Sequence, residues 1–381
     1  MFVTEAQSPG TAPVGYAVEF RSGRRERHGE GPPSFTISVA NESHFERILK
    51  GSVYAVALDF IRGGYDVSGD LVAAIRWREQ NSHRAFLDSW WALAARFAPV
   101  RMETWLQSRQ PAARNIRQHY DISTDFYRMF LESRLVYSAA LFENESWSLD
   151  QAQEAKLRKI CEDLDLQAGE RFLDVGCGWG ALIGYAADCY KAQATGCTLS
   201  HSQYEFARGL LDARGLEQSA RVFELDYRDL AGRFDKIASI GMFEHVGRHR
   251  LTKYFRKIHS LLEPGGLLLN SGIMRPEGVS DDPQTWFLLR RVFPGGELAH
   301  LSQVIRAAEK AGFVVVRIES LRKNYARTCQ EWVARLRRNR DACIALVGEQ
   351  IYRTWLLYLA ASAISFEQGR TNVFSILLAR D

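Results

Sequence analysis

Short apolar runs alternate with segments of helical periodicity along the chain after residue 111. In the helical segments the apolar residues recur every three or four positions, which is the spacing of an amphipathic helix. Expected helices span residues 154–164, 182–189, 202–214 and 251–262, and expected strands span 171–175, 192–197, 220–225, 234–240 and 266–270. Such alternation indicates a parallel sheet with crossover helices on both faces.

The pattern changes in the last third of the chain. Residues 270–303 are polar and aromatic with little strand character, so an insertion is expected there. A helix at 301–311 and a strand at 314–319 resume the alternation, and two helices bearing Arg and Trp precede a last strand at 373–378. The prediction is an α/β fold with a doubly wound, seven-stranded, Rossmann-like sheet.

The first hundred residues have a different character. Residues 1–33 are rich in Gly, Pro, Ser and Arg, which predicts a disordered tail. Residues 34–105 are expected to form a small α+β domain followed by a helical linker, whose aromatic side chains favour burial in a core over membrane contact. Residues 106–381 then form the larger domain.

Composition and charge narrow the range of functions. A formal net charge of +4 does not indicate a nucleic-acid partner. Basic clusters at 21–27 and 335–340 are expected to be solvated surface, the alternative being peripheral contact with an anionic membrane surface. The six cysteines show no metal-ligand spacing, so no metal is expected. Neither a membrane-spanning run nor a signal peptide is visible, so a cytoplasmic protein is expected.

A glycine-rich turn follows the first expected strand of the larger domain. Asp174, Gly176, Gly178 and Gly180 belong to the run LDVGCGWG, which leads from that strand into a helix. Glycines permit a tight turn and let the backbone approach a bound nucleoside. The spacing GxGxG suits a ligand without a pyrophosphate. Taken alone, such a cluster also fits a purely structural turn.

Residues after the next strands strengthen the first interpretation. Thr198, Leu199 and Gln203 follow the second strand, where polar groups can bond a ribose, and Asp226 and Tyr227 follow the third, where they can bracket an adenine. The runs GMFEHVG and LEPGG lie in the next two loops. Five such loops at one edge of one sheet indicate S-adenosylmethionine as the cofactor.

The order of the motifs resembles one family of methyltransferases that use this cofactor. HYD at 119–121, VYS at 136–138, LDVGCGWG, TLSHSQ, DYRDL and GMFEHVG are similar to motifs of the cyclopropane fatty acid synthase and mycolic acid cyclopropane synthase family. Residues 35–79 resemble the small N-terminal lipid-binding domain of its longer bacterial members. The resemblance also implies a homodimer.

The resemblance implies a specific chemistry on an unsaturated acyl lipid. The alkene attacks the methyl of S-adenosylmethionine, and a base removes a proton from the resulting carbocation to close a cyclopropane. Tyr137 and Ser138 would complete the cofactor site, while Tyr137 and Tyr325 match family positions whose rings stabilise the cation. Glu244 and Tyr325 are the expected catalytic residues. Without the resemblance, either tyrosine would fit ordinary core packing.

The sequence departs from the family where the family holds a bicarbonate ion as the base. Ala139 and Ser362 stand where the family has cysteines. Ser271 stands where it has a histidine, or Asn270 does if the register slips by one. Alanine has no side-chain donor, and serine lacks the charge and reach of an imidazole. We therefore expect bicarbonate to bind poorly.

Two outcomes of this departure are open. Under the first hypothesis, Glu244 or Tyr325 takes the proton and the product carries a methyl or methylene branch. Under the second, Ser271 with a water replaces the missing histidine and a cyclopropane still forms. His245 is expected to cap or orient its loop, although its place beside Glu244 would also suit an acid or base.

The remaining expectations concern the lipid and the closing segment. The acyl chain is expected to enter beside residues 274–300, where aromatic side chains would line it or belong to the core. Those side chains are Trp286, Phe287, Leu288 and Phe293. His119 and Asp121 are expected to fix a segment that closes over the cofactor.

Three functions are compatible with these features. The first is a lipid C-methyltransferase of the cyclopropane synthase type. The second is an enzyme of the same fold that methylates another alkene, such as a polyketide or terpenoid, and the lipid-binding domain argues against it. The third is a catalytically silent protein that binds lipid and cofactor, which the intact glycines and Glu244 disfavour.

Overall fold

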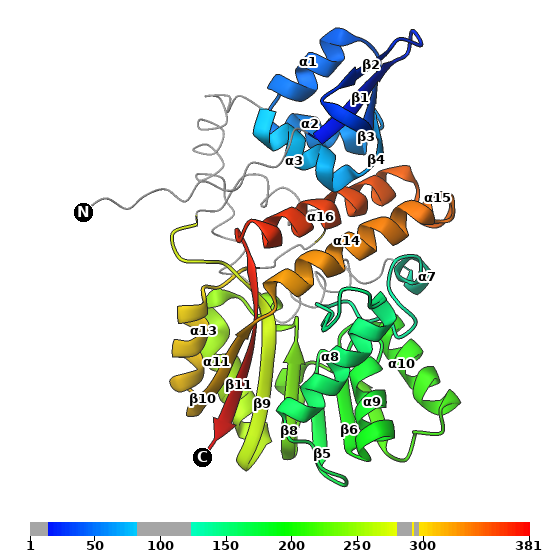
Figure 1. Cartoon of the computed structure of the whole chain (residues 1–381). Helices are drawn as coiled ribbons and strands as arrows, with labels where there is room; N and C mark the ends of the chain where they lie inside the picture. Colours follow the sequence, from blue (N-terminus) through cyan, green and yellow to red (C-terminus); the bar gives the residue numbers. More distant parts are fainter. Residues whose placement is uncertain (1–13, 82–122, 280–291, 293–296) are drawn as a thin grey trace, which may run out of the picture. The chain divides into compact units, whose positions relative to one another are not determined.

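The computed structural model describes residues 14–81, 123–279, 292 and 297–381 (Figure 1). The chain forms two compact units, Met1–Arg96 and Phe97–Asp381. Within the described ranges, no helix has both the length and the apolar character needed to span a membrane.

The first unit contains a four-stranded sheet in the order β2-β1-β3-β4, in which β1 and β3 are parallel and the other neighbours antiparallel. Three described helices accompany it, as the predicted α+β character of this part of the chain requires. The elements are β1 (Val14–Phe20), β2 (Arg25–His28), β3 (Glu30–Val39), α1 (Glu42–Lys50), α2 (Val53–Ile61), β4 (Asp66–Gly69) and α3 (Leu71–Asn81).

Strands β1 and β2 lie where the sequence predicted a disordered tail over residues 1–33, and that prediction is wrong from residue 14 onward. Ala17 and Val18 of β1 are fully buried and pair with Thr36 and Ile37 of β3. The run VGYAVEF has a large apolar residue at every second position, which is a strand signal. The surrounding Gly and Arg residues obscured it.

The second unit contains a seven-stranded sheet in the order β10-β11-β9-β8-β5-β6-β7. Strands β5 to β9 are parallel, β11 is antiparallel to β9, and β10 is antiparallel to β11. The strands are β5 (Arg171–Val175), β6 (Gln193–Thr198), β7 (Ala220–Glu224), β8 (Phe234–Ile240), β9 (Leu262–Met274), β10 (Phe313–Ser320) and β11 (Asn372–Arg380). The predicted seven-stranded sheet is confirmed.

Helices cover both faces of this sheet, as a doubly wound fold requires (Figure 1). Helices α8, α9 and α10 pack on one face through a core that includes Ile160, Ile183 and Leu211. Helices α11 and α13 pack on the other face through Phe255 and Val304. Their bounds are α8 (Leu149–Asp163), α9 (Ala181–Tyr190), α10 (His201–Ala213), α11 (Leu251–Leu261) and α13 (Leu301–Glu309).

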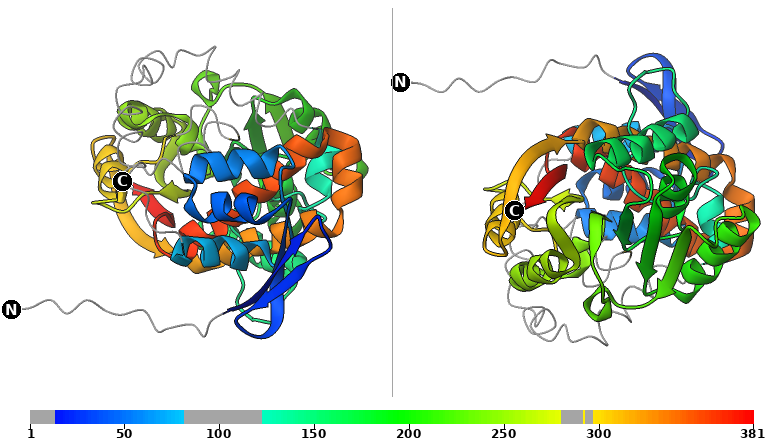
Figure 2. Two further views of the ribbon diagram at one scale, coloured as in Figure 1. Left: turned by 90° about the horizontal axis from the view of Figure 1, so that it is seen from above. Right: turned by 90° about the horizontal axis from the view of Figure 1, so that it is seen from below.

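Further helices precede and follow the sheet. Helices α14 and α16 pack side by side, as Figures 1 and 2 show. The additional elements are α7 (Thr124–Arg128), the short 3-10 helices η1 (Tyr227–Asp229), η2 (Phe243–His245) and η3 (Arg248–Arg250), α14 (Arg322–Arg338), α15 (Arg340–Val347) and α16 (Glu349–Glu367).

Two parts of the predicted pattern are corrected. Strand β9 continues to Met274 rather than ending at Asn270, because Ser271 to Met274 each have a partner in β11, from Ser375 back to Asn372. The C-terminal region contains three helices rather than two, since Gly348, with φ of 80°, separates α15 from α16. Ser271 therefore lies inside a strand and not in an insertion.

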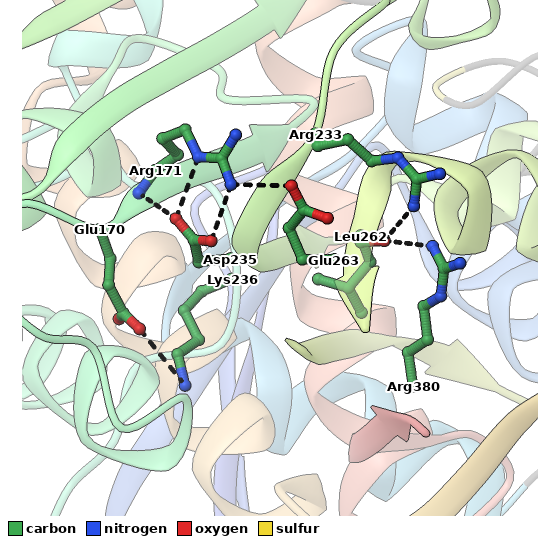
Figure 3. A network of polar contacts seen from close by, with 8 residues as sticks. All are labelled: Glu170, Arg171, Arg233, Asp235, Lys236, Leu262, Glu263 and Arg380. Carbon is green, nitrogen blue, oxygen red and sulfur yellow. Dashed lines mark hydrogen bonds and ion pairs between the residues drawn. The ribbon is translucent and has the colours of Figure 1, made fainter. Parts of the chain in front are cut away.

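A polar network ties the sheet together at the edge opposite the carboxyl ends of its parallel strands (Figure 3). Arg171 at the start of β5 bonds Asp235 of β8 and Glu263 of β9, each over 2.9 Å. Arg233 and Arg380 both donate to the carbonyl of Leu262. These bonds fix the amino ends of the central strands and leave the carboxyl ends open for a site.

Candidate active site

A cavity of about 630 Å³, here called the large cavity, lies at the carboxyl ends of β5, β6, β7 and β8. Ligands bind at this edge in doubly wound sheets. The structure brings together there nearly all of the residues predicted to hold the cofactor. They are Tyr137, Ser138, Asp174, Gly176, Gly178, Thr198, Leu199, Gln203, Asp226 and Tyr227. Gly180 is the exception and does not line the cavity.

The glycines after β5 serve different purposes. Gly178 has φ of 53°, and a Cβ added there would meet no atom within 4 Å, so this position forms open floor of the large cavity. Gly180 has φ of 86°, and a Cβ there would lie 2.9 Å from the Cβ of Ala207 on α10. Its role is therefore close helix packing at the start of α9 rather than ligand contact.

The opposite wall of the large cavity follows β6 and β7. Thr198 Oγ1 donates to Gln203 Oε1 over 2.8 Å, so these two buried side chains form one unit. Asp226 accepts the Arg228 backbone N–H over 2.9 Å and pairs with its guanidinium, which fixes the loop that carries Tyr227. Burial raises the pKa of Tyr227 to about 12, so its hydroxyl stays protonated and can donate a hydrogen bond.

The third wall is an irregular segment, residues 135–142, here called the strap. Gln153 of α8 donates to the carbonyls of Val136 and Ser138 over 3.2 and 2.9 Å. Thr328 of α14 accepts the backbone N–H of Ala140 over 3.0 Å. Side chains of two helices thus replace the missing secondary structure and hold Tyr137 and Ser138 against the cavity.

A second cavity, of about 60 Å³ and here called the small cavity, adjoins the large one. Tyr137, Ser138, Lys156, Ile240 and Gly241 line both cavities. The predicted catalytic residues Glu244, Ser271 and Tyr325 line the small cavity, as does Ala139. Three segments far apart in the sequence therefore meet at one point beside the predicted cofactor position.

Glu244 is the buried carboxylate of the small cavity. Its Oε1 accepts the Ile273 backbone N–H over 2.7 Å, whereas its Oε2 has no hydrogen-bond partner within the described part of the chain. Burial raises the pKa of Glu244 to about 7, and the Ile273 N–H lowers it by a smaller amount. Gly272 is required beside it, because a Cβ there would lie 2.8 Å from Oε1.

Aromatic rings enclose Tyr137 and Tyr325. The ring centroid of Tyr137 lies 5.1 Å from that of Trp332 and 5.6 Å from that of Tyr127. Tyr325 stacks on Phe366 at 4.5 Å and meets Trp332 edge-on at 5.9 Å. The negative faces of such rings attract a cation, so this cluster would favour positive charge beside it.

Ser362 does not line either cavity. Instead it is hydrogen-bonded to Tyr358, which lines the small cavity and is also hydrogen-bonded to Tyr137. His245 lines the large cavity, and burial lowers its pKa to about 4, so the imidazole is neutral at pH 7. A neutral His245 agrees with the expected loop-orienting role better than with that of a general acid.

Sequence reasoning missed Lys156, Tyr358 and Trp179. Trp179 lines the large cavity and sits inside the glycine motif, so its position in LDVGCGWG was a usable signal. Tyr358 lies among the apolar residues of α16 and reads as ordinary core. Lys156 reads as the solvated face of α8, and only the packed structure reveals its burial.

Several predicted residues lie outside the described ranges. They are His119 and Asp121 of the expected closing segment, and Trp286, Phe287, Leu288 and Phe293 of the expected acyl-chain wall. Asn270 is described, and its Oδ1 accepts a hydrogen bond from the hydroxyl of Tyr254 over 2.9 Å. This interaction commits Asn270 to the core and leaves Ser271 as the residue that lines the small cavity.

A doubly wound sheet with a glycine-floored cavity at its carboxyl edge is the architecture of a nucleoside-binding enzyme, and S-adenosylmethionine-dependent methyltransferases are one class that has it. Residues 107–376 match the family model described as mycolic acid cyclopropane synthetase. The chain therefore belongs to the mycolic acid cyclopropane synthetase family, which uses S-adenosylmethionine as methyl donor.

Individual relatives agree with this placement. A probable fatty acid methyltransferase from Pseudomonas putida is 38% identical and covers 92% of this chain and 88% of its own length. Cyclopropane mycolic acid synthase 3 from Mycobacterium tuberculosis is 35% identical, and the match covers 70% of this chain and 96% of that protein. The crystal structure of mycolic acid cyclopropane synthase CmaA1 complexed with SAH and CTAB aligns with a TM-score of 0.68 and 33% identity. The alignment covers 70% of this chain and 98% of that one.

Proposed function

We propose that this chain transfers the methyl of S-adenosylmethionine to the double bond of an unsaturated acyl lipid. The observation that carries the proposal is Glu244, a buried carboxylate with one unpartnered oxygen among the described residues, in a small cavity that shares its wall with the cofactor cavity. A base beside the donor's cavity suits a reaction that adds a carbon and then loses a proton.

The residues around the two cavities have distinct tasks in this proposal. The bound cofactor supplies an electrophilic methyl group. Tyr137 and Tyr325 line the small cavity and offer the reacting carbons aromatic rings that favour positive charge, while Trp332 packs against both rings. Glu244 then accepts a proton from the alkylated chain at Oε2, the oxygen that Ile273 does not bind.

The small cavity does not fit a bicarbonate ion as the base. Ala139 presents a methyl group, and Ser271 presents a short hydroxyl from within β9. Glu244 itself becomes negative near neutral pH and would repel a second anion at this distance. We therefore route no step through bicarbonate, and propose a methyl or methylene branch as the product in place of a cyclopropane ring.

The proposed lipid carrier is a phospholipid in a membrane surface. The relative named as a probable fatty acid methyltransferase supports an acyl substrate, because its similarity extends over 92% of this chain and so includes most of the first unit. We propose that the first unit contacts the lipid and that basic clusters at residues 21–27 and 335–340 contact anionic head groups. The protein would then be cytoplasmic, associate peripherally with the membrane and, as the family resemblance implies, form a homodimer.

Transfer of label tests the proposed function against its alternatives. The purified chain is incubated with methyl-labelled S-adenosylmethionine and vesicles of unsaturated phosphatidylglycerol, and the lipids are hydrolysed and separated. Label in the fatty acyl fraction supports the proposal. Label that appears only with a polyketide or terpenoid alkene would replace it, and cofactor binding with no transfer to any alkene would indicate a silent binding protein.

A further inference from the structure

Helix α11 and the short helix η3 before it carry basic side chains that the proposed reaction does not use. Arg250, Lys253, Arg256 and Lys257 are here called the α11 basic face, and neither element contains an acidic residue. Lys253 and Arg256 are exposed, whereas Arg250 and Lys257 are half-buried. The apolar side of the same helix packs on the sheet, so the basic face points away from the core.

These cations do not stabilise the helix that carries them. Arg250 is the N-cap residue of α11 and its side chain makes no capping hydrogen bond, and the first turn, which includes Lys253, has no acidic residue. A helix has the positive end of its dipole at the N-terminus, so cations there are unfavourable. Residues that disfavour their own local structure commonly serve a function.

The rest of the described chain does not neutralise the α11 basic face. Of the carboxylates close to it, Asp226 pairs with Arg228. Glu297 pairs with Arg248 and also accepts the backbone N–H of that residue over 2.8 Å. Lys257 donates to a backbone carbonyl over 2.6 Å, and none of the four cations forms an ion pair within the described ranges. Their charge is therefore available to a partner.

The basic cluster at residues 335–340 differs in this respect. Arg335 pairs with Asp150 over 3.1 Å, and Arg340 pairs with Glu349 over 3.6 Å. That cluster shares its charge with carboxylates of the chain, whereas the α11 basic face does not. The sequence pattern hid the α11 basic face because its four cations are interleaved with the buried apolar residues of an amphipathic helix.

The α11 basic face borders the active site. Arg250, Lys253 and Lys257 line the large cavity, and their spacing of three and four residues places them along one stripe of the helix. Because Lys253 is exposed and also lines the cavity, it lies at the opening of the cavity. The adenine ring expected beside Tyr227 has no negative charge for these cations to bind.

We propose that the α11 basic face binds the anionic head groups of a phospholipid surface. From residue 250 to residue 257 the helix rises about 10 Å, which exceeds the reach of one small anion and suits several head groups at once. Within the described chain no large apolar side chain is exposed on α11 or η3, so the contact is electrostatic and not an insertion.

The position of the base in the sequence gives this contact a purpose. Glu244 lies in η2, which precedes η3 and α11 along the chain. Docking of the α11 basic face therefore brings the segment that carries the base to the surface that holds the acyl chains. This inference rests on the proposed lipid substrate, which supplies the anionic surface.

Binding to vesicles by two variants with equal loss of charge tests the proposal. The full chain should bind vesicles of saturated phosphatidylglycerol, which offer no double bond for methyl transfer. Each lost cation should weaken binding about fivefold, so Lys253→Gln/Arg256→Gln should bind about 25-fold more weakly. Lys191→Gln/Arg221→Gln removes two exposed cations at the amino ends of β6 and β7. This control should bind like the unmodified chain, because physiological salt screens charges beyond about 8 Å.

A charge-conserving variant and a second ligand separate docking from a folding defect. Lys253→Arg/Arg256→Lys should bind vesicles like the unmodified chain, and S-adenosylhomocysteine affinity should be the same in all these proteins. Equal vesicle binding by Lys253→Gln/Arg256→Gln and by the control would overturn the proposal. Weaker S-adenosylhomocysteine binding with unchanged vesicle binding would assign the cations to the cofactor and overturn it too.

Two further outcomes concern the partner and the reaction. If the unmodified chain did not bind anionic vesicles, the partner of the α11 basic face would be an acidic protein and the proposal would be wrong. Normal docking without methyl transfer to unsaturated phospholipid would refute the proposed function and leave this inference intact.

Discussion

Glu244 has the two properties that a general base at neutral pH requires. One oxygen is held by the Ile273 N–H, which orients the carboxylate, and the other is unpartnered within the described residues. The pKa of Glu244, near 7, is close to neutral pH, and a general base is most effective when its pKa is close to the pH at which it works. Because burial also disfavours the ionised carboxylate, ionisation of Glu244 lowers the free energy of unfolding.

Replacement of Glu244 by Gln should abolish most of the methyl transfer while leaving cofactor binding intact. General bases contribute about 10²- to 10⁴-fold to rates, so a loss in that range is expected. In the unmodified chain, kcat/KM should rise with pH through about 7 as the carboxylate ionises. Rate measurements across pH 5.5–8.5 check both points, and a Glu244→Gln variant with normal rates would exclude the residue as the base.

The same substitution should stabilise the protein at alkaline pH. The folded-state pKa of Glu244 is raised from 4.5 to about 7, so the contribution of this residue to folding stability is greatest below pH 4.5 and is lost as pH rises through about 7. At about 1.4 kcal/mol per pK unit, the ionised carboxylate costs about 3 kcal/mol. Urea unfolding should show Glu244→Gln more stable than the unmodified chain by this order at pH 8 and similar to it at pH 4.5. A stability difference that is the same at both pH values would contradict the assignment.

Local sequence identified the residues of the site whose motifs adjoin strands, and missed those that depend on packing. Glu244 and Gly178 stand in loops directly after strands, so their place at the sheet edge followed from the strand pattern alone. Lys156 and Tyr358 lie within helices, where the side of the helix that faces a cavity depends on neighbours distant in the sequence. Ser362 failed as a direct site residue because Tyr358 stands between it and the small cavity.

At the scale of elements, the strap is the least regular part of the site and the most dependent on side chains. Residues 135–142 form neither helix nor strand, so their backbone groups require partners elsewhere. Gln153 and Lys156, three residues apart on α8, hold one end, and Asn324 and Thr328, four apart on α14, hold the other. Because residues three or four apart lie on one face of a helix, α8 and α14 each bond the strap at two points and hold Tyr137 in place.

Replacement of Thr328 by Val should loosen the strap. Valine has nearly the same shape but cannot accept the Ala140 N–H, which would remain buried without a partner at a cost of about 1–3 kcal/mol. Unfolding midpoints and S-adenosylhomocysteine affinity should both fall. Thr354→Val is the control, because the half-buried Thr354 hydroxyl bonds, among the described residues, the Gln350 carbonyl of its own helix, and it should change stability by less than about 0.5 kcal/mol. Equal effects of the two substitutions would contradict the role of Thr328 in holding the strap.

The larger errors in the sequence interpretation also belong to the scale of elements. Strand β9 gains its last four residues from pairing with β11, about a hundred residues later, and no local pattern reveals such a partner. Strand β1 was hidden because Gly and Arg on either side outweighed its short apolar alternation. Central strands such as β5 and β8 were predicted with their observed bounds because buried parallel strands are nearly continuous apolar runs.

At the scale of the whole molecule, the chain combines a methyltransferase unit with a small α+β unit. The two cavities, the strap and the proposed base all belong to the second unit. None of the described residues that line the two cavities belongs to the first unit, and the proposed contact with lipid is assigned to that unit.

Removal of residues 1–81 should separate cofactor binding from action on membranes. S-adenosylhomocysteine affinity should persist, because the lining of the large cavity starts at Leu135. Label transfer to vesicle phospholipid should fall at least about tenfold, since interfacial binding is lost, while transfer to detergent-dispersed lipid should remain. Unchanged transfer to vesicles would contradict a lipid-binding role for the first unit.

The central claim is that a carboxylate of the chain, and not a bound anion, completes carbon transfer to an acyl double bond. Its most direct test is proton NMR of the modified fatty acid, made by the purified chain in buffer freed of bicarbonate. We predict rapid formation of a branched acyl chain without upfield cyclopropyl protons, at a rate that added bicarbonate does not change. A cyclopropane that forms only when bicarbonate is restored would contradict the account.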